Sequence, residues 1–352
     1  MRLASCLLLG AALTVGAAPL RADHPDTLYM KNGDRLTGTI KKLNAGALQV
    51  SLDYADGTVA IGWNRVQRIG SPNLFIVYMA DGEVYSGRLA ILPSDETDSV
   101  RIQITTGEGE RVLIDKRQIA ALGSTSDTFW GRFSGNVASG LSYTKGNTNT
   151  AFSFSSSVLY VRPRWNAGLT FNSNLSSAEG ADRSTRNQGG LSASHLLRHQ
   201  NWFYAGYLNG LQSSEQEITL QATLGGGVGR YLRNTSDVKA SLVAGLTWQS
   251  TAYSENVTPG SSEDLVTALL NARMSYVRFK QTSFYLNANA MPALNDWGRI
   301  FYNVNATYYL QLFGELDWNL SFYGNWDTRP PAGSSGSDLG LNSGLSISFG
   351  DW

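Results

Sequence analysis

GLSYTKGNTNTAFSFSSSVLYV, residues 140–161, is the stretch that decides the fold. Small or polar residues alternate with apolar ones on both sides of a break at Gly146, Asn147 and Thr148. Alternation with a period of two predicts two β-strands, and the break predicts the turn of a hairpin. Such hairpins occur in soluble sheets and in membrane barrels alike. The rest of the chain therefore has to indicate which surface meets lipid.

The composition favours a membrane barrel over a helical membrane protein. Charged residues make up only 16% of the 352 residues, against about 25% in a typical soluble domain. Aromatic residues reach 11%, and glycine occurs 37 times. This combination is typical of outer-membrane barrels. The 28 basic residues balance the 28 acidic ones, and without a basic excess we expect no nucleic-acid partner.

Residues 1–22 have the features of a secretory signal peptide. Arg2 gives the positive start, Cys6–Ala18 is almost wholly apolar, and Ala22 is a small residue suited to cleavage. Cleavage removes the only cysteine, so we expect no disulfide and no cysteine metal site. It also removes Arg2 and Arg21 from the 28 basic residues, which leaves a net charge of about −2. No later apolar run approaches the roughly 18 residues of a spanning helix, so a membrane can be crossed again only by a closed barrel.

An internal repeat of about 50 residues occupies residues 24–124. Tyr29–Asp34 returns as Tyr78–Glu83, and Val59–Ile61 returns as Val112–Ile114. The pair Asn32-Gly33 in the first repeat and the pair Asp81-Gly82 in the second predict two-residue hairpin turns between short strands. Each repeat is therefore expected to be a small SH3-like or Sm-like β-barrel.

These observations predict a domain order after the signal peptide. We expect an SH3-like module over residues 23–71, a second over 72–124, a linker over 125–129 and a larger unit over 130–352. The two modules either bind a periplasmic protein partner through residues 24–124 or serve as a passive spacer.

The unit over residues 130–352 is predicted to be all-β, a transmembrane antiparallel barrel of about 12 strands. The expected strands begin near Trp130, Thr150, Trp165, Arg186, Trp202, Ile218, Asp237, Asp264, Ser283, Arg299, Leu316 and Leu339. Their connections alternate between short turns and longer loops, as in outer-membrane barrels whose short turns are periplasmic. An even number of strands places both barrel ends, and the N-terminal modules, on the periplasmic side.

Alternation also assigns the two faces of the strands. Tyr302, Val304 and Tyr308 are expected to face lipid, whereas the residues between them face the lumen. The candidate lumen-lining residues are Arg132, Lys239, Arg273, Tyr285, Asn303, Asn305 and Tyr309. Such a polar inner face would make a poor dry core for a soluble β-sandwich, which is the alternative all-β fold.

Acidic residues gather in the expected outer loops. The candidates are Glu215, Glu217, Glu255, Glu263, Asp264 and Asp338. They are either ordinary solvated loop residues or an acidic mouth that concentrates cations and binds divalent ions shared with lipopolysaccharide.

The stretch Gly140–Thr150, followed by Leu159–Arg162 and Trp165, resembles the start of the YdiY-type salt-induced outer membrane proteins, a bacterial domain of unknown function. The resemblance covers about residues 130–352. It implies a barrel in the outer membrane of a Gram-negative cell, in contact with outer-membrane lipid and lipopolysaccharide. It implies no activity, ligand or catalytic residue.

The C-terminus fits delivery to the barrel assembly machinery, which recognises a terminal aromatic residue. Alternating apolar residues from Leu339 end on Phe349, and a short extension ends on Trp352. Either aromatic residue can act as the signal.

We expect no enzyme, and no catalytic, cofactor or metal site. His195 and His199 lie four residues apart, roughly 13 Å along a strand, which is too far to share one ion. The alternative is an outer-membrane phospholipase-like lipid hydrolase with His195 and a serine. That chemistry needs its histidine near the outer rim, whereas His195 precedes an expected periplasmic turn. We therefore expect a narrow pore, or a structural or stress-related envelope component, with periplasmic interaction modules.

Overall fold

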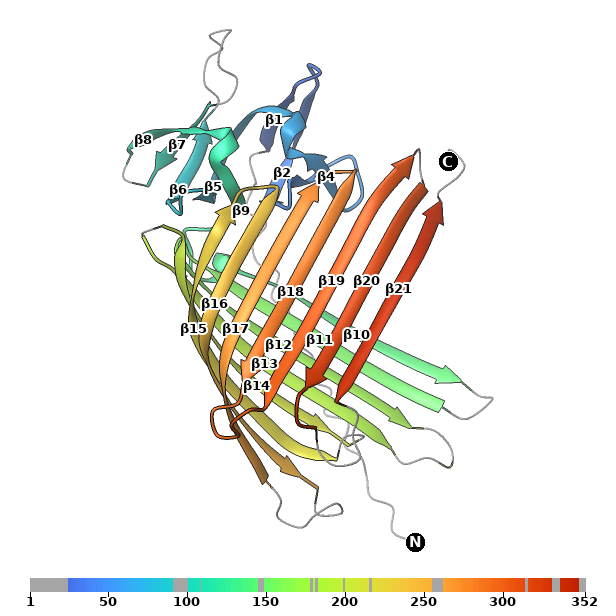
Figure 1. Cartoon of the computed structure of the whole chain (residues 1–352). Helices are drawn as coiled ribbons and strands as arrows, with labels where there is room; N and C mark the ends of the chain where they lie inside the picture. The colour runs from blue at the N-terminus through green and yellow to red at the C-terminus, as the bar shows by residue number, and fades with distance from the viewer. Residues whose placement is uncertain are drawn as a thin grey trace.

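The computed structural model describes residues 25–90, 101–107, 109–144, 149–177, 180, 183–198, 200–214, 217–254, 262–313, 316–330 and 336–347. These residues form two all-β units, a small N-terminal one and a large curved sheet (Figure 1). Within these ranges no helix is long and apolar enough to cross a membrane. The predicted signal peptide, Glu215, Glu255, His199 and both C-terminal aromatic candidates lie outside the described residues.

The N-terminal unit is a nine-stranded sheet. Its strands are β1 (Asp26–Met30), β2 (Arg35–Asn44), β3 (Ala47–Ser51), β4 (Thr58–Gly62), β5 (Val66–Met79), β6 (Val84–Ala90), β7 (Arg101–Thr106), β8 (Arg111–Asp115) and β9 (Ile119–Ser124). The 3-10 turns η1 (Trp63–Arg65) and η2 (Lys116–Gln118) precede the last strand of each repeat. That last strand returns to the first one: β5 begins beside β1, and β9 pairs with the second half of β5.

The first hairpin turns of the two repeats have the same geometry. Gly33 and Gly82 both have a φ of +93°, a region that favours glycine. Each turn is closed by a 2.8 Å bond, from the N–H of Met30 to Asp34 O and from the N–H of Met79 to Glu83 O. The hairpins form where the sequence predicts them, but the predicted two-residue turn length is wrong: three residues separate the closing pairs Met30–Asp34 and Met79–Glu83, and the third is the glycine at positive φ.

The two repeats share one strand and one apolar core. β5 runs without a break through the expected module boundary at residues 71 and 72. Leu28 of the first repeat and Phe75 and Ile104 of the second are buried in the same cluster. β9 also pairs with β2 of the first repeat. The likeness of either repeat to an SH3-like barrel stays a prediction.

The larger unit is a twelve-stranded antiparallel sheet whose strands follow in chain order. They are β10 (Phe133–Thr144), β11 (Asn149–Val161), β12 (Trp165–Ser177), β13 (Ser184–Leu196), β14 (Trp202–Ser213), β15 (Ile218–Asn234), β16 (Val238–Tyr253), β17 (Ser262–Arg278), β18 (Thr282–Pro292), β19 (Ile300–Phe313), β20 (Leu316–Asp327) and β21 (Ser337–Ile347). Each begins within three residues of its expected start. The predicted strand number and order are confirmed.

The curved sheet has one open seam. Every strand from β10 to β21 is hydrogen-bonded to the next, but among the described residues no pairing joins β10 to β21 (Figure 1). β10 is exposed along its whole length. The seam departs from the closed barrel that the sequence predicts. Water can satisfy the backbone groups of an open edge, whereas lipid cannot, so closure is required only in a membrane.

The N-terminal unit, which we call the cap, lies against the short-turn end of the large sheet (Figure 1). The N–H of Gly46 donates to Ser236 O at 2.8 Å. Asn201 Nδ2 donates to Ala80 O at 2.7 Å, and Arg164 forms an ion pair of 3.1 Å with Glu83. The cap therefore contacts three successive short turns, at the end where the even strand count predicts it.

Candidate functional site

The concave face of the large sheet and the cap together line a chamber of about 1470 Å³. The strands from β11 to β19 contribute most of the wall. The cap contributes Asn44, Tyr78 and Ala121. Because the cap supplies part of the lining, it borders the chamber at the short-turn end.

The register separates the two faces of the sheet as the alternation predicts. Asn305 and Thr307 line the chamber, whereas their neighbour Tyr308 lies opposite Leu320 on the other face. The outer face carries large apolar side chains that are more than half exposed, such as Leu246 (58%) and Leu270 (56%). The sheet thus has a polar concave face and an apolar convex face.

A row of asparagines crosses four strands on the concave face. Asn271, Asn289, Asn303 and Asn325 stand directly opposite one another on β17 to β20. The Nδ2 of Asn271 donates to Oδ1 of Asn289 at 2.7 Å, and that of Asn289 to Asn303 at 3.3 Å. Asn303 Nδ2 in turn donates to Asn325 Oδ1 at 2.5 Å. Each amide has further donor or acceptor capacity, so the row can bind uncharged polar groups.

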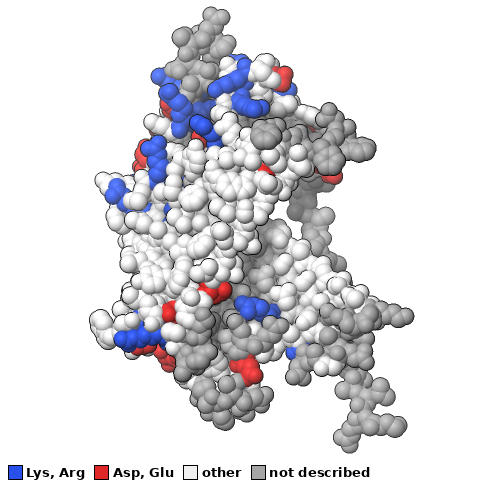
Figure 2. Space-filling model, turned by 45° about the vertical axis from the view of Figure 1, so that its right-hand side comes forward, with Lys and Arg blue, Asp and Glu red and all other residues white. Residues whose placement is uncertain are grey.

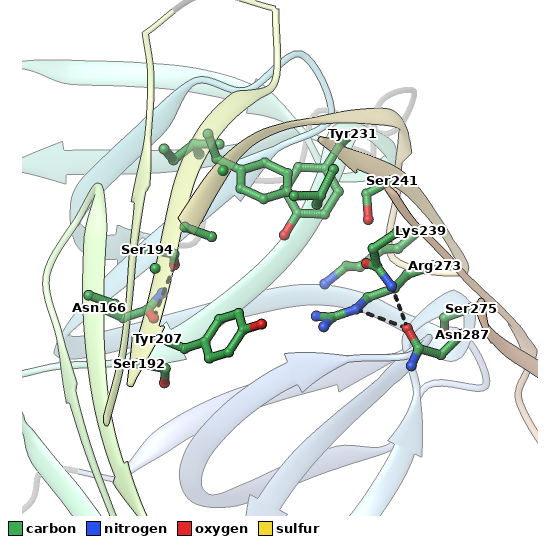
Figure 3. Close-up of a pocket in the computed structure, with 18 of the residues that line it drawn as sticks. Asn166, Ser192, Ser194, Tyr207, Tyr231, Lys239, Ser241, Arg273, Ser275 and Asn287 are labelled. Atoms are coloured by element: carbon green, nitrogen blue, oxygen red, sulfur yellow. Dashed lines mark hydrogen bonds between the residues drawn. The ribbon is translucent and has the colours of Figure 1, made fainter. Parts of the chain in front are cut away.

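Two cations from neighbouring strands project into the chamber (Figure 3). Lys239 stands opposite Ser275, and Arg273 stands opposite Ser241. Arg273 Nε donates to Asn287 Oδ1 at 3.3 Å, and Lys239 Nζ donates to Asn44 Oδ1 of the cap at 3.3 Å. Both basic side chains are therefore held by neutral amides.

Glycines on β15 let aromatic rings lie flat along the chamber wall. A Cβ on Gly225 would meet the ring of Tyr207, and a Cβ on Gly229 would meet that of Phe203. Tyr207 and Phe203 both line the chamber (Figure 3 labels Tyr207). The glycines of this run thus serve close packing inside a strand.

Ion pairs occur at the long-loop end of the large sheet, where the sequence places the acidic candidates. Arg299 pairs with Asp327 at 2.8 Å, with Glu263 at 3.3 Å and with Asp296 at 3.8 Å. Arg329 lies 3.6 Å from Asp296. Of the described acidic candidates, Glu263 thus has a basic partner. The other described candidates are Glu217, in the turn before β15, Asp264, near the start of β17, and Asp338, on β21.

The candidate lumen-lining residues fall into three groups. Lys239, Arg273, Tyr285 and Asn305 line the chamber. Asn303 belongs to the amide row beside it, and Tyr309 lies on the same face of β19 as Asn305, near the end of the strand. Arg132 lies elsewhere, because its guanidinium donates to Ser126 O at 2.9 Å and to Asp127 O at 3.2 Å in the linker.

Sequence reasoning missed part of the chamber. Tyr207 and Tyr231 alternate correctly for the concave face, so their parity could have found them. Asn44 and Tyr78 could not be found that way, because they reach the chamber only through docking of the cap.

His195 lies on the outer face of β13, directly opposite Trp165 and Tyr204. The adjacent Ser194 accompanies it in sequence but lines the chamber and donates to Asn166 Oδ1 at 3.1 Å. Ser194 also borders the outer groove that contains His195, while its hydroxyl is bonded to Asn166 on the concave side. Among the described residues there is also no group of three or more His, Cys, Asp or Glu placed to hold a metal ion.

Lys116 is a buried base inside the cap. It stands over the ring of Trp63, with Nζ 4.5 Å from the ring centroid, and donates to the carbonyls of Trp63 and Val66. Burial lowers the pKa of its ammonium from the ordinary 10.5 to about 8, and nearby Lys31 adds to the shift. This base joins the second repeat to the first.

A family model described as "Protein of unknown function, DUF481" matches residues 137–349. The match covers the large sheet and leaves the cap outside. It falls on the part of the chain for which the sequence predicts a family resemblance, and it is consistent with that resemblance. No curated protein matches the chain.

Proposed function

This chain belongs to the DUF481 family of unknown function, and we propose that it is an outer-membrane β-barrel that forms a narrow pore with a periplasmic cap. The observation that carries the proposal is the polar chamber, whose short-turn end is lined by Asn44, Tyr78 and Ala121 of the cap. A water-filled lumen with a lining of amides, hydroxyls and bases is what a pore for small polar solutes requires.

The convex face supports the membrane part of the proposal. Leucines such as Leu208, Leu246 and Leu270 leave about half or more of their surface uncovered. An apolar area that spans so many strands marks a surface that meets lipid or protein. In lipid, β10 and β21 also have to pair, because an unpaired strand edge leaves backbone groups without partners.

The contacts of the cap support a gating role. The ion pair between Arg164 and Glu83 has both side chains partly exposed. Such a pair contributes about 0.2–1 kcal/mol. Together with a few hydrogen bonds, such as those of Asn201 and Gly46, it holds the cap firmly but reversibly. A cap of this kind closes the periplasmic end until it moves.

Planar-bilayer recording of the purified full chain tests the pore. We expect small, discrete conductance steps that become more frequent when the cap contacts are weakened. A complete absence of conductance steps contradicts the pore if both the unaltered chain and a variant with weakened cap contacts are correctly inserted. A structural or envelope-stress role then remains.

The cap also supports a proposal of a periplasmic partner. Figure 2 shows basic side chains gathered over it, and its exposed bases include Arg35, Lys41, Arg88, Arg101 and Arg111. We expect the full chain to capture a periplasmic protein in a pull-down and to lose it when Arg35, Arg88 and Arg111 become glutamine. Equal recovery with both chains favours a passive spacer.

A further inference from the structure

We propose that the chamber contains a binding site for a small hydroxylated oxyanion, formed by Lys239 and Arg273. This inference deepens the proposed pore and rests on it, because the solute has to reach the chamber. It names the class of solute that the pore selects.

The register brings the two bases together. Lys239 on β16 pairs with Ser275 on β17, and Ser241 on β16 pairs with Arg273 on β17. The bases therefore occupy diagonal positions on adjacent strands of one face, within reach of a shared ligand. Figure 3 shows both side chains directed into the same space, opposite the hydroxyl of Tyr207.

Their charge is not neutralised by the protein. Among the described residues, neither Lys239 nor Arg273 has a carboxylate within ion-pair distance, and the residues that line the chamber include no Asp or Glu. The third base of the lining, Arg164, already pairs with Glu83. Asp237, the carboxylate nearest to Lys239 in sequence, accepts from Ser236 Oγ at 3.1 Å in the turn. An anion is the missing partner.

The surrounding groups indicate what else the ligand carries. A guanidinium binds a carboxylate or phosphate through two parallel hydrogen bonds, and an ammonium adds a compact charge. Ser241, Ser275 and Asn287 line the same region and can bind hydroxyl groups. A sugar acid offers a carboxylate to the two bases and hydroxyl groups to the serines and the amide. The parent sugar offers only the hydroxyl groups.

Calorimetric titration of the detergent-solubilised full chain with D-gluconate and D-glucose tests the site. We expect gluconate to bind and glucose to bind at least tenfold more weakly. Lys239→Gln and Arg273→Gln should each weaken gluconate binding roughly ten- to hundredfold, as expected for loss of a charge-assisted hydrogen bond. Arg233→Gln is the matched control, because Arg233 is exposed and does not line the chamber.

Equal affinity for gluconate and glucose, or unchanged gluconate binding in both variants, overturns the proposal. Lys239→Arg keeps the charge and should retain most of the binding, which separates loss of the site from loss of folding. Gluconate binding without conductance in bilayers leaves the anion site in place and overturns the pore. Conductance without gluconate binding leaves the pore in place and overturns the anion site.

Discussion

Lys239 Nζ donates a 3.3 Å hydrogen bond to Asn44 Oδ1, across 195 positions of the sequence. Lys239 belongs to the wall of the chamber, and Asn44 belongs to the cap. One ammonium group therefore contributes to the proposed anion site and to closure of the chamber. A ligand that draws this group inward weakens one contact of the cap.

Competition for that ammonium gives the first prediction. Asn44→Ala removes the acceptor and frees Lys239 for the ligand, so gluconate should bind about two- to fivefold more tightly, in line with loss of one competing hydrogen bond. Calorimetry on the full chain measures the change. Asn64→Ala, at an exposed residue of η1, is the control, and a weaker affinity in Asn44→Ala argues against competition.

Charge reversal at the cap contact gives the second prediction. In the unaltered chain, the guanidinium of Arg164 lies 3.1 Å from the carboxylate of Glu83. Glu83→Arg replaces this attraction with the repulsion of two like charges. We expect the open probability in bilayers to rise about two- to fivefold, since a partly exposed pair is worth up to about 1 kcal/mol.

The double change Glu83→Arg with Arg164→Glu should return the open probability toward that of the unaltered chain. Glu110→Arg, in the exposed hairpin between β7 and β8, controls for charge alone. If Glu83→Arg and the control Glu110→Arg change the open probability equally, the contact between Glu83 and Arg164 does not hold the cap.

Closure of the seam gives the third prediction. Ala138 of β10 and Asn342 of β21 both lie on the concave face, near the middle of their strands. With cysteine at Ala138, and at Gly340, Asn342 or Gly344 in turn, at least one pair should form an intramolecular disulfide in the membrane. Non-reducing electrophoresis detects it as a faster monomer. Disulfides that appear only between chains indicate that the seam pairs with a second copy.

The buried base of the cap gives the fourth prediction. The pKa of Lys116 is about 8 in the folded cap and 10.5 in the ordinary state, so the unfolded chain binds more protons between these values. Stability of the cap should therefore rise as pH increases from 8 to 10.5, and this dependence is absent below pH 8. The melting temperature of the full chain minus that of Lys116→Met should therefore increase from pH 8 to pH 10.5. A difference in melting temperature that is the same at pH 7 and pH 10 contradicts a depressed pKa.

The sequence predicts the large sheet well because its signals are local. Alternation along β19 assigns Asn303 and Asn305 to one face and Tyr308 to the other, and short turns mark the strand ends. Each of these signals lies within one hairpin, so a single sequence contains all of it.

The chamber is predicted less completely because its closure depends on distant segments. Asn44 meets Lys239, and Asn234 Nδ2 meets Met79 O at 3.4 Å, through docking of the cap. No spacing along the chain encodes such contacts. The ion pairs of Arg299 were missed for the same reason, since Glu263 reaches it from β17 and Asp327 from β20.

A paired substitution on the two faces of the sheet tests the central claim most directly, namely that the convex face meets lipid and the concave face meets water. Leu246 is 58% exposed near the middle of β16, and Asn305 is exposed on the concave face of β19. The quantity to measure is the change in the free energy of unfolding in lipid vesicles caused by Leu246→Arg and by Asn305→Arg. The account predicts a loss of about 2–4 kcal/mol for Leu246→Arg and little loss for Asn305→Arg. Equal, small losses for both substitutions would contradict a lipid-facing convex surface.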